Sequence, residues 1–175
     1  MKSRLMLQLC FLAAIVNVAA ADGFPEAKTI LYPAEVREAL EKATSVELLS
    51  LNYKIAGVEA RKKHPGEFFD GLLVLGSVQL KDAEQKKLVA AFHQSVTNWD
   101  GAIGCFSPRH GIRVKHAGST YDLVICFECI TVVVNKDGKH FATALLKNPP
   151  ADLFNQFLKD AKVPLPEQPE PEADE

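Results

Sequence analysis

Apolar side chains recur at helical spacing in three segments of the chain. Each segment opens with residues suited to a helix start: Pro33 in the first, Asp82 with Gln85 at the capping-box position in the second, and Pro149-Pro150 in the third. The apolar faces are Val36, Ala39, Leu40 and Ala43, then Leu88, Val89, Phe92 and Val96, then Leu153, Phe154, Phe157, Leu158 and Ala161. The pattern predicts three amphipathic helices, the second ending near Asn98.

Strand-like patterns fill the segments between these helices. Residues 45–52 alternate apolar and polar side chains, and residues 72–80 form an apolar strand that Gly76 interrupts, which indicates a bulge. A loop is expected between these two strands. From residue 111 the pattern is that of a β-meander, with strands at 112–116, 121–134 and 140–146 and a hairpin turn at 135–138.

The long strand predicted at 121–134 changes its alternation part-way. The first apolar set is Leu123, Ile125 and Phe127, and the second, on the opposite face, is Ile130, Val132 and Val134. A one-residue bulge or a break between Phe127 and Cys129 would return both sets to one face. An unbroken strand would also be more than about 40 Å long, roughly twice the usual length. We therefore expect an irregularity here, with Cys126 and Cys129 still too far apart along the strand for an easy disulfide.

Together these elements predict a single α+β domain at residues 22–163. Its sheet is mainly antiparallel, with about four to six strands and helices packed on it, and it ends in a C-terminal β-meander followed by a helix. About 140 residues are enough for a hydrophobic core that needs no disulfide. The chain has no internal repeat, no Gly-rich phosphate loop, and no G-x-S-x-G or H-E-x-x-H motif.

The two ends of the chain differ from this domain. Residues 1–21 have the charged start, apolar run and small-residue cleavage site of a secretory signal peptide. The apolar run is short for a membrane span and contains polar residues. We therefore predict export to the periplasm or the cell exterior, with no membrane attachment after cleavage. Residues 164–175 alternate proline with acidic residues and predict a disordered tail.

The net charge of the chain argues against a nucleic-acid partner. The chain has 20 Lys and Arg residues against 22 Asp and Glu residues, a formal net charge of −2. The basic run at 61–64 precedes Pro65-Gly66 and is expected to decorate an exposed loop. We predict no nucleic-acid partner and expect a monomer, and the sequence identifies no other partner.

Three cysteines and one histidine form the most distinctive pattern: Cys105, His110, Cys126 and Cys129. The fourth cysteine, Cys10, lies in the predicted signal peptide, so the exported chain would carry an odd number of thiols. An odd number in a secreted protein indicates a free thiol, an intermolecular disulfide or a ligand role. Because disulfides persist in oxidising compartments, we favour a disulfide from Cys105 to either Cys126 or Cys129.

Four other interpretations of this pattern stay open. Cys105, His110, Cys126 and Cys129 could form a Cys3His zinc site, which makes zinc the one cofactor that the sequence suggests. Cys126 and Cys129 could be a redox pair, but such pairs precede a helix and strand-like residues follow here. The cysteines could be reduced and buried as small apolar side chains. A cysteine nucleophile with His110 as its base lacks an evident orienting acid.

The segment 108–113 is a candidate anion site. A restricted loop that presents Arg109 and His110 beside a cysteine could hold an anion by charge-assisted hydrogen bonds, and the candidate anion-binding residues are Arg109 and Arg113. The simpler interpretation is a polar entry to a hairpin, with Arg113 and Lys115 on the solvent face of an alternating strand.

Two blocks of the sequence resemble a known pattern. Residues 105–113, CFSPRHGIR, and 122–129, DLVICFEC, are similar to those of uncharacterised exported bacterial proteins in which a C-F-x-P-R-H-G block precedes a C-F-x-C strand. The resemblance extends over most of the predicted domain and implies that the two blocks occur together, without implying an activity. The sequence thus predicts an exported binding or envelope-structural module rather than an enzyme. The alternative is a metal-binding or thiol-redox protein centred on Cys105, His110, Cys126 and Cys129.

Overall fold

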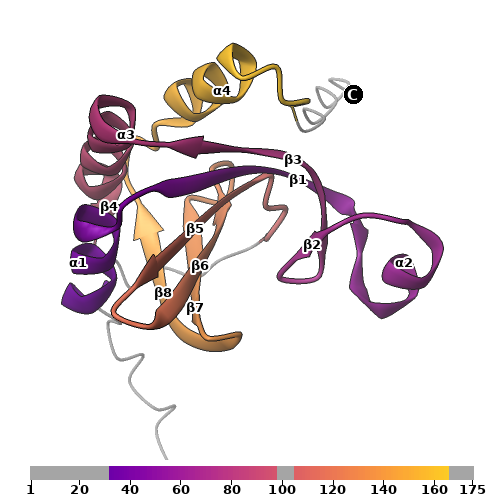
Figure 1. Ribbon diagram of the computed structural model, residues 1–175. Helices are drawn as coiled ribbons and strands as arrows, with labels where there is room; N and C mark the ends of the chain where they lie inside the picture. Colours follow the sequence, from indigo (N-terminus) through magenta and orange to yellow (C-terminus); the bar gives the residue numbers. More distant parts are fainter. Residues whose placement is uncertain (1–31, 98–104, 166–175) are drawn as a thin grey trace, which may run out of the picture.

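The computed structural model of the protein describes residues 32–97 and 105–165. The predicted signal peptide and residues 166–175 of the predicted tail lie outside the described residues. Within them the chain forms four helices and eight strands (Figure 1). In chain order these are α1 (Ala34–Lys42), β1 (Val46–Ala56), α2 (Gly57–Lys63), β2 (Phe68–Phe69), β3 (Leu72–Leu80), α3 (Asp82–Ser95), β4 (Val96–Thr97), β5 (His110–His116), β6 (Ser119–Cys126), β7 (Thr131–Lys136), β8 (Lys139–Leu146) and α4 (Ala151–Asp160).

The eight strands of the described ranges belong to one antiparallel sheet, in the order β2-β3-β1-β5-β6-β7-β8-β4. The predicted α+β class is confirmed, whereas the predicted four to six strands are too few. Two of the additional strands, β2 and β4, are two residues long, which is too short for an alternating pattern to be visible. The third arises because the single strand predicted at 121–134 is in fact β6 and β7.

The chain reverses direction between β6 and β7. Cys126 ends β6 and pairs with Thr131, the first residue of β7. The Ile130 N–H donates to the Phe127 carbonyl, and Ile130 has a φ of 48°, a left-handed conformation that is unusual for a β-branched residue. The predicted single strand is therefore wrong, whereas the break that the sequence allowed between Phe127 and Cys129 is present as part of this turn. The slip in alternation marks a hairpin turn, because the apolar pattern starts afresh on each side of a reversal.

Of two further local predictions, the bulge at Gly76 is confirmed and the capping box of α3 is wrong. The predicted bulge at Gly76 is confirmed, since Ser50 pairs with Gly76 and the next residue of β1 pairs with Val74, which leaves one extra residue in β3. The capping box at the start of α3 is wrong, because Lys81 occupies the N-cap position and makes no side-chain cap bond. The Gln85 side chain instead donates a hydrogen bond of 2.8 Å to the Ala43 carbonyl, at the C-terminal end of α1.

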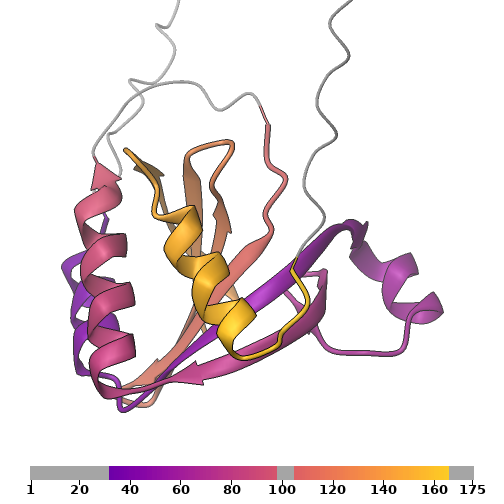
Figure 2. The same cartoon turned by 90° about the horizontal axis from the view of Figure 1, so that it is seen from above.

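Helices α1, α3 and α4 cover one face of the sheet, and the main core lies beneath them. Figure 2 shows α4 lying over the strands and α3 to one side of them, with α1 beside α3. The predicted helix faces supply this core, as shown by the fully buried Leu40, Leu88 and Phe154. The helix α4 begins after Pro150, as predicted, and its predicted face is buried except at its two ends. The core and the cleft described below both depend on this helix.

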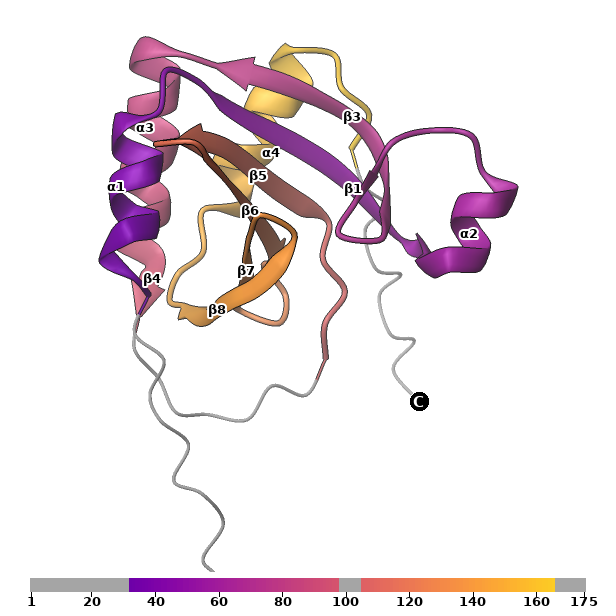
Figure 3. The same ribbon diagram turned by 60° about the horizontal axis from the view of Figure 1, so that its bottom comes forward.

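A smaller core lies on the opposite face of the sheet, where Leu49, Leu51, Phe69, Leu72 and Val124 pack together. The segment predicted as a plain loop after β1 holds the exposed helix α2, which projects from the body of the protein, and the strand β2 (Figure 3). Strand β2 places Phe69 against Gly111 of β5. A Cβ atom at position 111 would lie 2.8 Å from the Phe69 ring, so this position has room only for glycine.

We predict that Gly111→Ala lowers the free energy of unfolding by about 1–3 kcal/mol, because the added methyl group overpacks a fully buried ring. Urea unfolding measures the change, and Val58→Ala on the exposed helix α2 is the control, expected to stay within about 0.5 kcal/mol. Combining Gly111→Ala with Phe69→Leu should cost less than the sum of the two single changes. Additive costs would contradict the steric explanation.

Candidate functional site

Cys105 and Cys129 form a disulfide, with their Cα atoms 5.8 Å apart. The sequence predicted a disulfide from Cys105 to Cys126 or Cys129, and the structure selects the second of these partners. Cys126 is free and buried, and its sulfur accepts a hydrogen bond of 3.2 Å from the Cys129 N–H. The disulfide joins the segment that enters β5 to the turn between β6 and β7.

The four predicted zinc ligands are not arranged as one ligand set in this oxidised chain. Cys105 and Cys129 have given up their thiolates to the disulfide, and zinc binds the thiolate form of cysteine. His110 directs its Nε2 atom to an amide rather than towards a sulfur. Residues 32–97 and 105–165 contain no group of three or more His, Cys, Asp or Glu side chains that could hold a metal ion. A Cys3His site would therefore require the reduced chain.

A cleft of about 230 Å³ lies beside the disulfide. Three segments that are distant in the sequence supply its walls: the segment entering β5, the turn between β6 and β7, and the start of α4. Its lining residues are Ser107, Arg109, His110, Phe127, Glu128, Pro149, Ala151 and Asn155. Because the disulfide joins the first two segments, it holds two of the three walls together.

Arg109 places a buried positive charge in this cleft. Its backbone is fixed between two strands, since its N–H donates to the Ile125 carbonyl and its own carbonyl accepts from the Leu51 N–H. The side chain is 7% exposed, its guanidinium lies 4.8 Å from the centre of the Tyr53 ring, and it pairs with Glu128. Its Nε has no hydrogen-bond partner in the structure, so a buried donor is left unsatisfied.

His110 follows directly and points to the helix-covered face of the sheet. Its Nε2 lies 2.9 Å from Oδ1 of Asn155 on α4, and its ring packs 4.9 Å from the Phe127 ring and 6.0 Å from the Phe154 ring. Burial lowers the pKa of His110 to about 4, against a smaller opposing effect of the hydrogen bond to Asn155, so the ring is neutral at pH 7. Because Oδ1 can only accept, the proton of this neutral ring is on Nε2.

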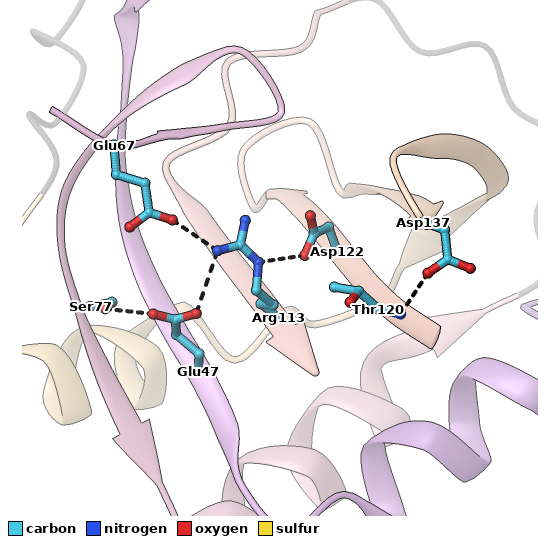
Figure 4. A network of polar contacts seen from close by, with 7 residues as sticks. All are labelled: Glu47, Glu67, Ser77, Arg113, Thr120, Asp122 and Asp137. Carbon is cyan, nitrogen blue, oxygen red and sulfur yellow. Dashed lines mark hydrogen bonds and ion pairs between the residues drawn. The ribbon is translucent and has the colours of Figure 1, made fainter. Parts of the chain in front are cut away.

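Arg113, the second arginine of the predicted anion site, is not part of the cleft. It lies three residues after His110 on the same strand and therefore on the other face of the sheet. Its guanidinium lies among three carboxylates, 2.9 Å from Asp122, 2.8 Å from Glu67 and 3.7 Å from Glu47 (Figure 4). These carboxylates would repel a bound anion. Arg113 lines a separate cavity together with Glu47 and Lys115, so of the two predicted arginines only Arg109 lines the cleft beside the disulfide.

Several lining residues were not singled out from the sequence. Asn155 lies on α4 between apolar positions and has no motif of its own, so only the fold shows that it meets His110. Glu128 lies within the C-F-E-C segment, but its pairing with Arg109 depends on the reversal after β6. The one sequence signal for Glu128 was its position between the candidate residues Cys126 and Cys129.

Comparison of the chain with protein-family models, with curated proteins and with solved structures finds no match. The resemblance to exported bacterial proteins therefore stays a prediction. Within the described parts of the chain, no helix is long and apolar enough to cross a membrane.

We predict that His110 makes the protein more stable at neutral pH than at pH 4.5. The pKa of histidine is ordinarily about 6.5, and in the folded protein that of His110 is about 4, so between these values the unfolded chain binds the extra proton. This contribution is fully present above pH 6.5 and is lost as the pH falls towards 4. By pH 4.5 the loss is about 2–3 kcal/mol.

Urea unfolding at pH 7 and pH 4.5 tests this, with His110→Gln expected to lose about 2 kcal/mol less than the natural protein. His93→Gln is a companion variant, because burial also lowers the pKa of His93 to about 4. An unchanged pH dependence in His110→Gln would show that His110 does not contribute.

Proposed function

We propose that this chain is an exported binding module whose ligand occupies the cleft around Arg109. The ligand class is a small organic molecule that carries a carboxylate next to an apolar group. The observation that carries this proposal is that Arg109 lines the cleft with a buried side chain whose Nε has no hydrogen-bond partner. Export is supported by the signal-like residues 1–21 and by the disulfide, which is compatible with an oxidising compartment.

The charge of Arg109 favours an anionic ligand. A buried guanidinium is costly unless its donors are satisfied, and Arg109 has one carboxylate partner and one aromatic neighbour. Its partner Glu128 has a side chain that is 41% exposed and lies on a turn, so it can move into water at little cost. A ligand carboxylate that replaced Glu128 would gain the two-pronged hydrogen bonding that arginine offers.

The rest of the lining fits a small ligand with an apolar part. Phe127, Pro149 and Ala151 form apolar wall, while Ser107 and Asn155 add polar groups. The volume is below the roughly 300–1,000 Å³ of clefts that hold drug-sized molecules. A ligand about the size of an acylated amino acid would match these dimensions.

The same cleft favours binding over catalysis. An activated nucleophile needs a base within hydrogen-bond reach and a third group that orients the base. The Nε2 of His110 is instead occupied by the neutral amide of Asn155, and the ring is held between aromatic side chains. His110 therefore positions α4 against the sheet and shapes one wall of the cleft.

Binding of N-acetyl-leucine, followed by NMR of the ¹⁵N-labelled protein, tests this proposal. We expect shifts at residues that line the cleft, and no binding of N-acetyl-leucinamide, which has the same shape without the charge. Arg109→Gln should weaken binding by about tenfold or more, in line with the loss of a charge-assisted hydrogen bond. Arg113→Gln, which removes an arginine outside the cleft, should leave the affinity unchanged.

The affinity of the variant Glu128→Gln tests whether the ligand is negatively charged. If Glu128 competes with a bound carboxylate, its neutralisation should tighten binding of N-acetyl-leucine several-fold. Weaker binding in Glu128→Gln, or equal binding of the acid and its amide, would overturn the proposal of an anionic ligand.

A further inference from the structure

All three cysteines of the described residues meet at the turn between β6 and β7. Cys126 is a free thiol that is 1% exposed, and the Cys129 N–H donates to its sulfur at 3.2 Å. Cys129 is 7% exposed, and its sulfur is bonded to that of Cys105, which is exposed. A buried thiol therefore lies next to the inner end of a disulfide whose outer end faces solvent.

We infer that Cys126 exchanges with this disulfide and thereby makes Cys105 a site of covalent modification by small disulfides. In the first step the Cys126 thiolate, its proton given to water, attacks the Cys129 sulfur. The bond between Cys126 and Cys129 forms as the bond between Cys105 and Cys129 breaks, and Cys105 leaves as a thiolate. One disulfide exists before and after the step, so the exchange needs no oxidant or reductant.

The turn makes this exchange geometrically accessible. The sequence placed Cys126 and Cys129 along one strand, too far apart to bond, but the structure replaces that strand by a reversal. Residues three apart across a tight turn have Cα atoms within about 7 Å, and a disulfide spans about 4.4–6.8 Å. The hydrogen bond from the Cys129 N–H already holds the Cys126 sulfur over this residue.

The difference in solvent exposure between Cys105 and Cys126 determines which sulfur reacts with an external reagent. Cys105 is the exposed sulfur, so it leaves into water, where its thiolate is solvated. Cys126 is buried, so an external reagent reaches its thiol poorly, and the exchange transfers the free thiol to the exposed Cys105. In the second step the Cys105 thiolate attacks a small disulfide, forms a mixed disulfide at Cys105, and releases one small thiolate.

The three sulfurs lie close in sequence to residues that line the cleft, but the exchange proceeds without a bound ligand. Phe106, next to Cys105, is 42% exposed and offers apolar contact to a reagent that approaches this sulfur. Phe127 and Glu128, which lie between the two cysteines of the new pair, line the cleft. The exchange itself needs only the three sulfurs.

Incubation of the folded protein with glutathione disulfide at pH 7, 8 and 9 tests the inference. Peptide mapping without reduction should find glutathione on Cys105 and a new disulfide between Cys126 and Cys129. The rate should rise with pH, because the thiolate is the attacking species, and should not depend on protein concentration, because the exchange is internal. Without the reagent, iodoacetamide should trap Cys105.

Two variants separate this exchange from simpler thiol chemistry. Cys126→Ser and Cys126→Ala both keep the disulfide between Cys105 and Cys129 and remove the attacking sulfur, so neither should acquire glutathione on Cys105. Persistence of the adduct in these variants would show direct attack from outside and overturn the inference. An adduct on Cys126 of the natural protein, or no adduct up to pH 9, would overturn it as well.

Discussion

The reversal of the chain between Cys126 and Thr131 is the constraint on which the site depends. Because β6 ends at Cys126, Phe127, Glu128 and Cys129 lie in a turn at the end of two central strands instead of alternating across the faces of the sheet. The turn sends Phe127 towards His110 and Glu128 towards Arg109, and it brings Cys129 to Cys105. A strand continued through this segment would have directed neighbouring side chains to opposite faces of the sheet.

The consecutive basic residues Arg109 and His110 are both buried, but in different charge states. Arginine stays charged in proteins. Arg109 is buried against the carboxylate of Glu128 and the face of the Tyr53 ring, and its Nε still has no hydrogen-bond partner. Histidine can shed its charge, so His110 is buried as a neutral ring whose single N–H is accepted by Asn155. The cleft therefore combines the Arg109 guanidinium, paired with the carboxylate of Glu128, with the neutral ring of His110.

The sequence predicts the parts of the fold that rest on local periodicity and misses those that rest on chain reversal or distant contact. The apolar faces of α1, α3 and α4 are visible because each extends over at least two turns of helix. The division of 121–134 into β6 and β7 is missed because no glycine or proline marks the turn, whose left-handed position is held by Ile130. The sequence narrows the disulfide partner of Cys105 to Cys126 or Cys129. Choosing between these two residues requires knowledge of the turn. The pairing of Asn155 with His110 joins elements 45 residues apart, and nothing in either segment indicates the other.

The disulfide and the cleft share structure, and this has a thermodynamic consequence. The bond between Cys105 and Cys129 joins the segment that carries Ser107 and Arg109 to the turn that carries Phe127 and Glu128. A ligand that contacts both segments binds better when they are joined, and it therefore favours the disulfide at Cys105 over the one within the turn. By linkage the reverse also holds: in the proposed exchange, moving the disulfide to Cys126 and Cys129 removes the covalent link between the two segments and would weaken binding of the proposed ligand by the same factor. Under these two proposals, the turn that the disulfide and the cleft share couples thiol chemistry to ligand affinity.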